Sequence, residues 1–212
     1  ATLDASANMS RAALMLYEAT GEAVYIDHAR SWAGVLERHY RDDTAGGYFL
    51  TADDTADVIT RTKNAHDNAT PSGNGTMTDV LARLYHLTGE EAYRRDAEAL
   101  VSAFSGEVAK NAFPYATLIS GAAVLTAAVQ LIIIGNRADT ATGALIHAAA
   151  ETYVPGLTLT VITPGATLPA NHPAAGKRPI DGAVTAYVCI GQACSLPITD
   201  VATLRARLTP VA

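Results

Sequence analysis

The chain has 212 residues, of which 49% are apolar and 17% are charged, and its formal net charge is −6. This length suits one large domain or two small ones, and the apolar fraction is enough to bury a core. The acidic balance, with no Lys/Arg run longer than a pair, disfavours nucleic acid and anionic membranes as partners, because both attract concentrated basic surface.

An internal repeat dominates the first part of the chain. Residues 16–25 read LYEATGEAVY, and residues 84–93 read LYHLTGEEAY. Each copy predicts a helix, a tight turn and a second helix, because Gly21 and Gly89 suit the positive φ found at a helix C-terminus. We expect the glutamate after each glycine to lie in the first turn of the next helix. The predicted helices cover residues 5–19, 22–39, 72–87 and 90–104, and a fifth covers about 115–129.

The connection between the two helical hairpins, residues 42–71, is rich in Gly and Asp. Structureless loops of this length are uncommon inside a domain. Residues 47–50 and 57–60 predict short strands, with a turn at Asp53 and Asp54 between them. We therefore expect a β-hairpin within the connection.

Residues 116–135 carry no charge and have about the length of a membrane-spanning helix. Ser120, Thr126 and Gln130 interrupt the apolar stretch, and it ends in the β-branched run at residues 131–134. The pattern favours a buried helix that leads into a buried strand over a membrane span.

The last part of the chain predicts a small α/β unit. The expected elements are strands at 131–134 and 157–162, a helix at 138–153, a hairpin of 184–190 with 193–196, and a last helix from a Thr199-Asp200 cap to about residue 208. The strand–helix–strand order predicts a parallel pair. We therefore divide the chain into an αα-hairpin part, residues 1–130, and an α/β part, residues 131–212.

The two cysteines, Cys189 and Cys194, are too few for a disulfide framework or a four-ligand zinc site. A two-residue turn at Gly191-Gln192 would place them opposite each other. Sparse cysteine is typical of a reducing cytosol, so we expect a cytoplasmic protein with both residues as thiols. Neither the histidines nor the loop aspartates show metal-ligand spacing, and no metal or cofactor is predicted.

The chain begins Ala-Thr-Leu without an initiator Met or signal peptide, so we expect the C-terminal piece of a larger protein. Two helical hairpins and one helix cannot close a ring. The apolar face of the first hairpin, with Leu14, Tyr17, Val24 and Trp32, should therefore be exposed or covered by a missing N-terminal part of the protein or by another copy.

The residues from Arg61 to Asn74 concentrate polar chemistry: two cations, an imidazole at His66, a carboxylate at Asp67 and small polar side chains at Ser72 and Asn74. Sugar chemistry needs a carboxylate or imidazole for proton transfer and many hydrogen-bonding groups. The alternative is structural, with Ser72 as a helix N-cap and Asp67 fixing the loop. The residue types leave both interpretations open.

The motifs at residues 46–49, 61–63, 67–74 and 87–89 occur in a fixed order, and residues 187–189, Cys194, Pro197 and Thr199-Asp200 follow them. This order resembles the thioredoxin-domain-containing family of the spermatogenesis-associated type. The resemblance implies an N-terminal thioredoxin-like domain, absent here, followed by a six-hairpin, glycosidase-like α/α toroid. The fold expected for this chain is thus mainly α, an incomplete α/α toroid of αα-hairpins followed by a small α/β unit.

The resemblance implies a carbohydrate-active toroid, glycosidase-like or sugar 2-epimerase-like, with a carbohydrate ligand. It marks Lys63, Asp67, Ser72 and Asn74 as matching the family's motif. Asp67 is the expected catalytic acid or base, and the expected substrate contacts are Arg61, Lys63, Ser72, Asn74 and Tyr48. The alternative is a non-catalytic interaction or scaffold module attached to the thioredoxin-like domain.

Overall fold

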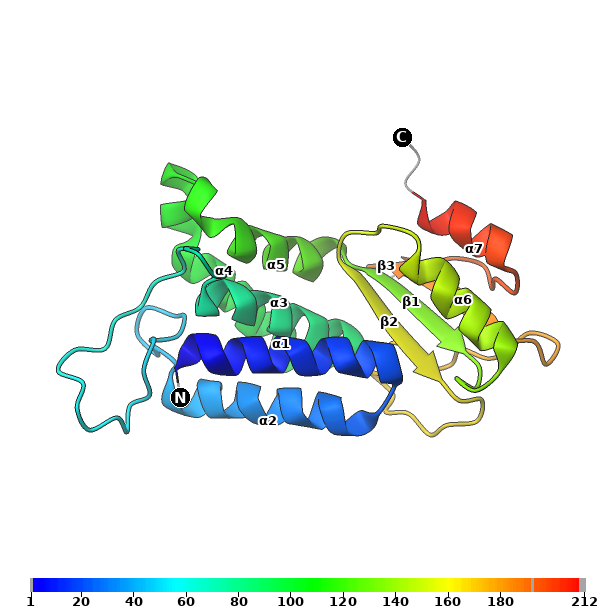
Figure 1. The fold of residues 1–212 in the computed structure, drawn as a ribbon, viewed down its shortest axis with the longest axis horizontal. Helices are drawn as coiled ribbons and strands as arrows, with labels where there is room; N and C mark the ends of the chain where they lie inside the picture. The colour runs from blue at the N-terminus through cyan, green and yellow to red at the C-terminus, as the bar shows by residue number, and fades with distance from the viewer. Residues whose placement is uncertain (1, 192, 210–212) are drawn as a thin grey trace. The chain divides into compact units, whose positions relative to one another are not determined.

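A computed structural model describes residues 2–191 and 193–209 of the chain as a helix-rich fold with one small sheet (Figure 1). The chain forms two compact units. The first comprises Ala1–Tyr85 and Glu90–Leu125, and the second comprises His86–Gly89 and Thr126–Ala212.

The helical elements agree with those expected from the repeat. They are α1 (Leu3–Thr20), α2 (Ala23–His39), α3 (Gly73–Thr88), α4 (Glu91–Lys110), a 3₁₀ turn at Phe113–Tyr115 and α5 (Ala116–Ala127). Gly21 and Gly89 have φ values of 77° and 74°, which confirms both predicted turns. The glutamates that follow them, however, are the N-cap residues of α2 and α4 and do not lie in the first turn.

The first hairpin pairs α1 and α2 side by side, antiparallel (Figure 1). Leu14 is fully buried, although it was expected on an uncovered face. Val24 is 47% exposed, and other apolar side chains of these two helices are also exposed: Met9, Met15, Leu16 and Val35. Ion pairs link the repeats, since Arg30 contacts Glu90 at the start of α4, and Arg83 of α3 contacts Glu18 of α1.

Helices α3 and α5 approach each other closely at two glycines. A Cβ built on Gly75 would lie 2.9 Å from the backbone nitrogen of Leu118, and one on Gly121 would lie 2.7 Å from that of Asp79. These separations are below any ordinary carbon–nitrogen contact, so the two backbones pack where side chains larger than hydrogen do not fit.

The connection before α3 does not contain the predicted β-hairpin. Tyr48 forms a single bridge with Arg41, and Leu50 donates a backbone hydrogen bond to Thr62 over 2.8 Å. Residues 57–60 form no strand, and Ile59 is fully exposed. The prediction was wrong for this second strand because two adjacent β-branched residues in a polar loop have no apolar surface to cover.

The second unit contains the predicted α/β elements. They are β1 (Val129–Ile134), α6 (Thr140–Ala150), β2 (Leu157–Ile162), β3 (Thr185–Ile190), β4 (Ala193–Cys194) and α7 (Val201–Leu208). The strand order is β2-β1-β3-β4, with β1 and β2 parallel and the other neighbours antiparallel, so the predicted parallel pair is confirmed.

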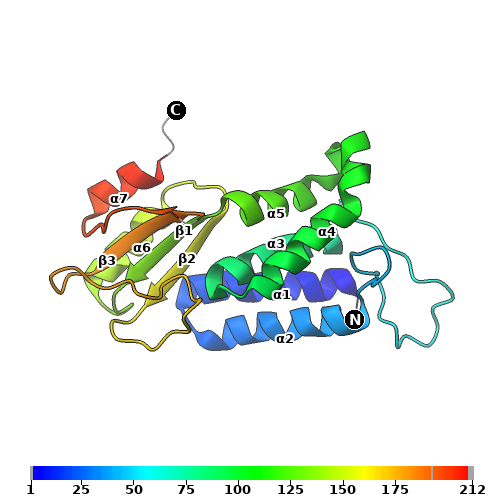
Figure 2. The same ribbon diagram turned by 180° about the vertical axis from the view of Figure 1, so that it is seen from behind.

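The two faces of this sheet are covered differently. Leu131 and Ile133 pack with apolar residues of α6 and α7, which lie on one face (Figure 2). Ile132 and Ile134 point to the other face because successive strand residues alternate, and they pack with Ala174 from the loop between β2 and β3. No helix in the described ranges is both long and apolar enough to cross a membrane.

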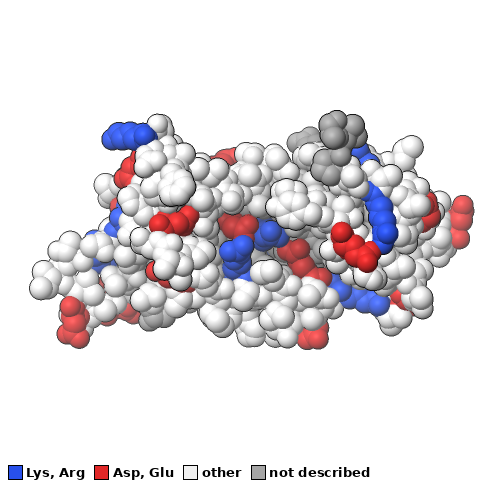
Figure 3. Space-filling view, turned by 45° about the horizontal axis from the view of Figure 1, so that its top comes forward, with Lys and Arg blue, Asp and Glu red and all other residues white. Residues whose placement is uncertain are grey.

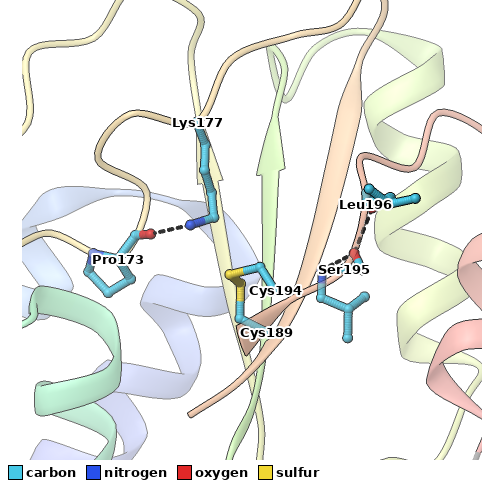
Figure 4. The surroundings of a disulfide bond; sticks show 7 residues. Pro173, Lys177, Cys189, Cys194, Ser195 and Leu196 are labelled. Carbon is cyan, nitrogen blue, oxygen red and sulfur yellow. Dashed lines mark hydrogen bonds between the residues drawn. A yellow bond between two sulfur atoms is a disulfide. The ribbon is translucent and has the colours of Figure 1, made fainter. Parts of the chain in front are cut away.

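The β3–β4 hairpin pairs Cys189 with Cys194 and Ile190 with Ala193, as predicted. Gln192 of the predicted turn lies outside the described residues. The expectation of free thiols was wrong, because the two cysteines form a disulfide bond (Figure 4). Their directly opposed register places the Cα atoms 3.9 Å apart, so both sulfurs lie within bonding reach.

Candidate functional site

Asn74, near the start of α3, holds the connection in place. Its side-chain Oδ1 accepts a hydrogen bond from the backbone nitrogen of Tyr48 over 2.8 Å. Its Nδ2 donates to the carbonyl oxygens of Tyr48, over 2.9 Å, and Asn64, over 2.7 Å. Asn74 is fully buried, so three backbone groups of the connection depend on one side chain.

Asp67 and Ser72 bind helix termini. The Asp67 carboxylate accepts hydrogen bonds from the backbone nitrogens of Ser72, over 2.9 Å, and Thr117, over 2.7 Å. Ser72 directly precedes α3 and Thr117 lies in the first turn of α5, where the helix dipoles favour an anion. Ser72 Oγ accepts from the Gly75 nitrogen over 3.2 Å and therefore caps α3. Burial raises the pKa of Asp67, but the hydrogen bonds from Ser72 and Thr117 outweigh it and lower the pKa overall.

The two cations of the connection also bind protein groups. The Lys63 ammonium donates to Asp42 Oδ2 over 2.6 Å and to the Gly46 carbonyl over 2.5 Å. The Arg61 guanidinium donates to two backbone carbonyls and lies 4.2 Å from the centre of the Phe49 ring. The Tyr48 hydroxyl donates to Glu37 over 3.0 Å.

All six candidate residues thus lie in the connection or at the start of α3. Each of them forms a hydrogen bond with another group of the protein. A ligand contact by Asp67, Arg61, Lys63, Ser72, Asn74 or Tyr48 stays a prediction. Of these six residues, only Lys63 is among the described residues that line a pocket of about 470 Å³ between the connection and the end of α4.

An Asp67→Asn substitution is expected to lower the free energy of unfolding by about 2 kcal/mol. The amide retains one acceptor oxygen and presents an NH₂ group to the second backbone N–H, so one charge-assisted hydrogen bond is lost. Chemical denaturation of the variant and of Asp57→Asn, an exposed loop carboxylate, measures the difference. Equal stability of the two variants would exclude the clamping role and favour the predicted catalytic one.

The Asp42–Lys63 pair is expected to make stability depend on acid. The hydrogen bond from Lys63, followed by those from the backbone of Ala45 and Thr44, lowers the pKa of Asp42 from 3.8 to about 2. Its stabilising contribution is therefore complete above about pH 4 and is lost as the pH falls through about 2. Wild type should unfold at higher denaturant concentration than Asp42→Asn at pH 6, and the gap should close at pH 2. A gap that is the same at both pH values contradicts the assignment.

Two neighbouring acids, Glu37 and Asp96, meet the Arg41 guanidinium beside Tyr48. Burial, and then the nearby Glu37 charge, raise the pKa of Asp96. Paired carboxylates are what glycoside hydrolysis requires. The cavity that they line is only about 20 Å³, however, which is far smaller than a sugar ring. We therefore assign this cluster no ligand.

A larger pocket of about 470 Å³ opens beside the connection. Its lining comes from the connection itself, from the last turn of α4 and from the segment that joins α4 to α5. The lining residues are Lys63, Asn64, His66, Glu107, Lys110, Asn111, Pro114 and Tyr115. The backbone bond from Asp67 to the Pro114 carbonyl, 2.7 Å long, fixes the two segments to each other.

A chain of hydrogen bonds runs from Glu107 through Tyr115 to His66. The Tyr115 hydroxyl donates to Glu107 Oε2 over 2.5 Å, and His66 Nε2 lies 2.5 Å from the same hydroxyl oxygen. Burial, and then the bond to Glu107, raise the pKa of Tyr115 to about 12, so the phenol keeps its proton at neutral pH. Since the hydroxyl donates its hydrogen bond to Glu107, it can accept one from His66 Nε2, and in that tautomer of the neutral imidazole Nδ1 is the free acceptor.

Sequence reasoning identified His66 as a possible proton shuttle but missed Glu107, Tyr115 and Lys110. These three lie about 40 to 50 positions further along the chain, so no local spacing connects them to His66.

Among residues 2–191 and 193–209, no three His, Cys, Asp or Glu side chains gather closely enough to hold a metal ion. On the face shown in Figure 3, basic and acidic side chains are interspersed.

Comparison with known proteins finds relatives but no matching family model. The chain is 30% identical to human spermatogenesis-associated protein 20 over 205 residues, which cover 94% of this chain and 26% of that protein. It is 28% and 29% identical to the rat and mouse proteins of the same name, over 92% of this chain. The chain therefore spans about a quarter of the length of the curated relatives that it matches.

Proposed function

We propose that the pocket beside the connection binds a small carbohydrate and that His66 transfers a proton to and from it. The observation that supports this proposal is the hydrogen-bonded chain Glu107–Tyr115–His66, which ends at an exposed imidazole in an open pocket. A carboxylate that orients a base through an intermediate group is a common arrangement in proton-transfer sites.

The pocket favours epimerisation or isomerisation over glycoside hydrolysis. Hydrolysis uses two carboxyl groups on either side of the bond, whereas Glu107 is the one carboxylate that lines this pocket. Proton abstraction next to a carbonyl needs one base and a nearby cation for the enolate oxygen. Return of the proton by the same base to the neighbouring carbon gives isomerisation, whereas epimerisation takes the returning proton from water or an acid on the opposite face. His66 Nδ1 would take the proton, and Glu107 would stabilise the resulting imidazolium through Tyr115. Lys110, the last residue of α4, also lines the pocket and would supply the cation.

The αα-hairpins suit the expected α/α toroid, in which loops at one end of the ring surround the substrate. The 61–74 connection lies at the N-terminal ends of α3 and α5, where such a mouth would form. In this proposal the chain supplies the sugar-binding and proton-transferring groups of the site, and the rest of the ring would enclose the bound sugar.

Solvent-deuterium exchange tests the proposed chemistry. The full chain is incubated in D₂O with a panel of aldoses, ketoses and amino sugars, and NMR follows loss of the proton at C2. Wild type should catalyse exchange in at least one sugar, and His66→Gln should slow it by about a hundredfold or more. Tyr115→Phe should slow exchange with unchanged sugar affinity, because the ring remains packed while the link to Glu107 is lost.

The matched control is His147→Gln, which removes an exposed imidazole from α6. It should exchange at the wild-type rate. Exchange in no sugar, or equal rates in wild type and His66→Gln, would refute the proposed function.

A further inference from the structure

A second and larger cavity lies within the α/β unit, at the carboxyl ends of the parallel strands. Its volume is about 690 Å³, and Ile134 and Ile162, the last residues of β1 and β2, form part of its wall. In α/β sheets, ligands bind in the crevice outside the carboxyl ends of parallel strands. The lining comes otherwise from the loop between β2 and β3, and none of it belongs to the His66 pocket.

The cavity has an apolar floor and a basic rim. Leu168 and Ala174 pack with Ile134 and Ile162 under the loop, so the floor is built from side chains that are buried or half-buried. Lys177 and Arg178 are consecutive lining residues on the loop. A ligand that fills this space therefore meets hydrocarbon on one side and positive charge on the other.

The two cations have no anionic partner within the described residues, since neither forms an ion pair there. The Lys177 ammonium donates to the Pro173 carbonyl over 2.8 Å (Figure 4). It also lies 5.8 Å from the centre of the Tyr187 ring. Burial lowers the pKa of this amino group. A half-buried ammonium with one neutral hydrogen-bond acceptor retains donors that an anion would satisfy.

The loop leaves room for a ligand to approach its backbone. Gly165 and Gly176 line the cavity, both with positive φ, and a Cβ on either would meet nothing within 4 Å. Neither glycine is needed to avoid a clash inside the protein. Their positive φ sets the course of the loop around the cavity, with its backbone uncovered on that side.

We propose that this cavity binds a small organic anion, a carboxylate or phosphate monoester on an apolar body. The apolar body rests on Ile134, Ile162 and Leu168, and the anionic group is held by Lys177 with Arg178 at the rim. This site is independent of the proposed carbohydrate chemistry, because it lies in the other unit and shares no residue with the His66 pocket.

Ligand titration by NMR with the full chain tests the site. The probes are hexanoate and phenyl phosphate, compared with hexan-1-ol, which lacks the charge, and inorganic phosphate, which lacks the apolar body. At least one organic anion should bind saturably and more tightly than both comparison probes, with shifts in the methyl signals of Ile134 and Ile162. The stronger of the two anions identifies the preferred head group.

Substitutions then separate charge from packing. Lys177→Met keeps the apolar stem and should weaken anion binding by about tenfold or more, while Lys177→Arg restores it. Arg207→Met removes the same charge from an exposed position on α7 and should change nothing. If Lys177→Met does not fold by circular dichroism, Arg178→Met provides the charge deletion. Absence of saturable binding by both anions, or equal affinity in wild type and these charge-deleted variants, would overturn the proposal.

Discussion

Gly121→Ala is expected to lower the free energy of unfolding by about 3 kcal/mol, one of the largest effects of any single substitution in this chain. The added Cβ would lie 2.7 Å from the backbone nitrogen of Asp79 and 3.0 Å from the carbonyl carbon of Thr78. Both are backbone atoms of α3, so no rotamer change relieves the clash and the two helices must separate. Because Asp67 joins the N-termini of these helices, their separation would also disturb the 61–74 connection.

The matched control is Gly106→Ala in α4, where an added Cβ meets nothing within 4 Å. Alanine should stabilise this helix by about 0.5–1 kcal/mol, because glycine loses more backbone entropy on folding. Urea denaturation of both variants gives the comparison. Unfolding free energies for Gly121→Ala at or above wild type would show that α3 and α5 are not packed backbone to backbone.

Asn74→Ala is expected to cost about 3 kcal/mol of stability. The substitution leaves the Tyr48 N–H and the Tyr48 and Asn64 carbonyls without the partner that Asn74 provides at a fully buried position. Asn74→Asp should also destabilise, because a carboxylate keeps the acceptor but turns oxygen toward two carbonyl oxygens. The effect should appear both in denaturation and as faster amide hydrogen exchange at residues 46–50.

Asn68→Ala provides the control, since Asn68 is an exposed residue of the same connection, and its hydrogen bond to the Thr70 carbonyl is donated by the backbone nitrogen. Its stability should lie within about 0.5 kcal/mol of wild type. If Asn74→Ala were equally mild, water would have to replace the side chain, and the connection would not depend on Asn74 for its shape.

Much of the fold was predictable because local signals and tertiary packing agree. The glycines of the two repeated turns fix helix ends that need positive φ, and the alternation at residues 157–162 gives β2 with the bounds observed. The hairpin predicted in the connection is absent because local signals and tertiary packing disagree there. Val58 and Ile59 have strand propensity, but the backbone of the connection finds its partners in Asn74, Asp67 and Arg61 instead.

The sequence indicated where polar side chains concentrate, but not what they bind. Polar side chains such as Asp67, Ser72 and Asn74 suit both sugar hydroxyls and backbone amides, and their residue types do not distinguish these roles. In the structure they bind backbone groups, which fixes the position of the neighbouring His66. Glu107 and Tyr115 become visible as its partners only when the end of α4 is folded against the connection.

NMR of the histidine imidazole signals tests most directly whether the pocket beside the connection is a ligand site. The full chain is titrated with the panel of aldoses, ketoses and amino sugars, and the signals of His66 and His147 are followed together. At least one sugar should shift the His66 signal saturably and leave the His147 signal in place. If no sugar moves the His66 signal, or if both signals move in parallel without saturation, the pocket does not bind carbohydrate.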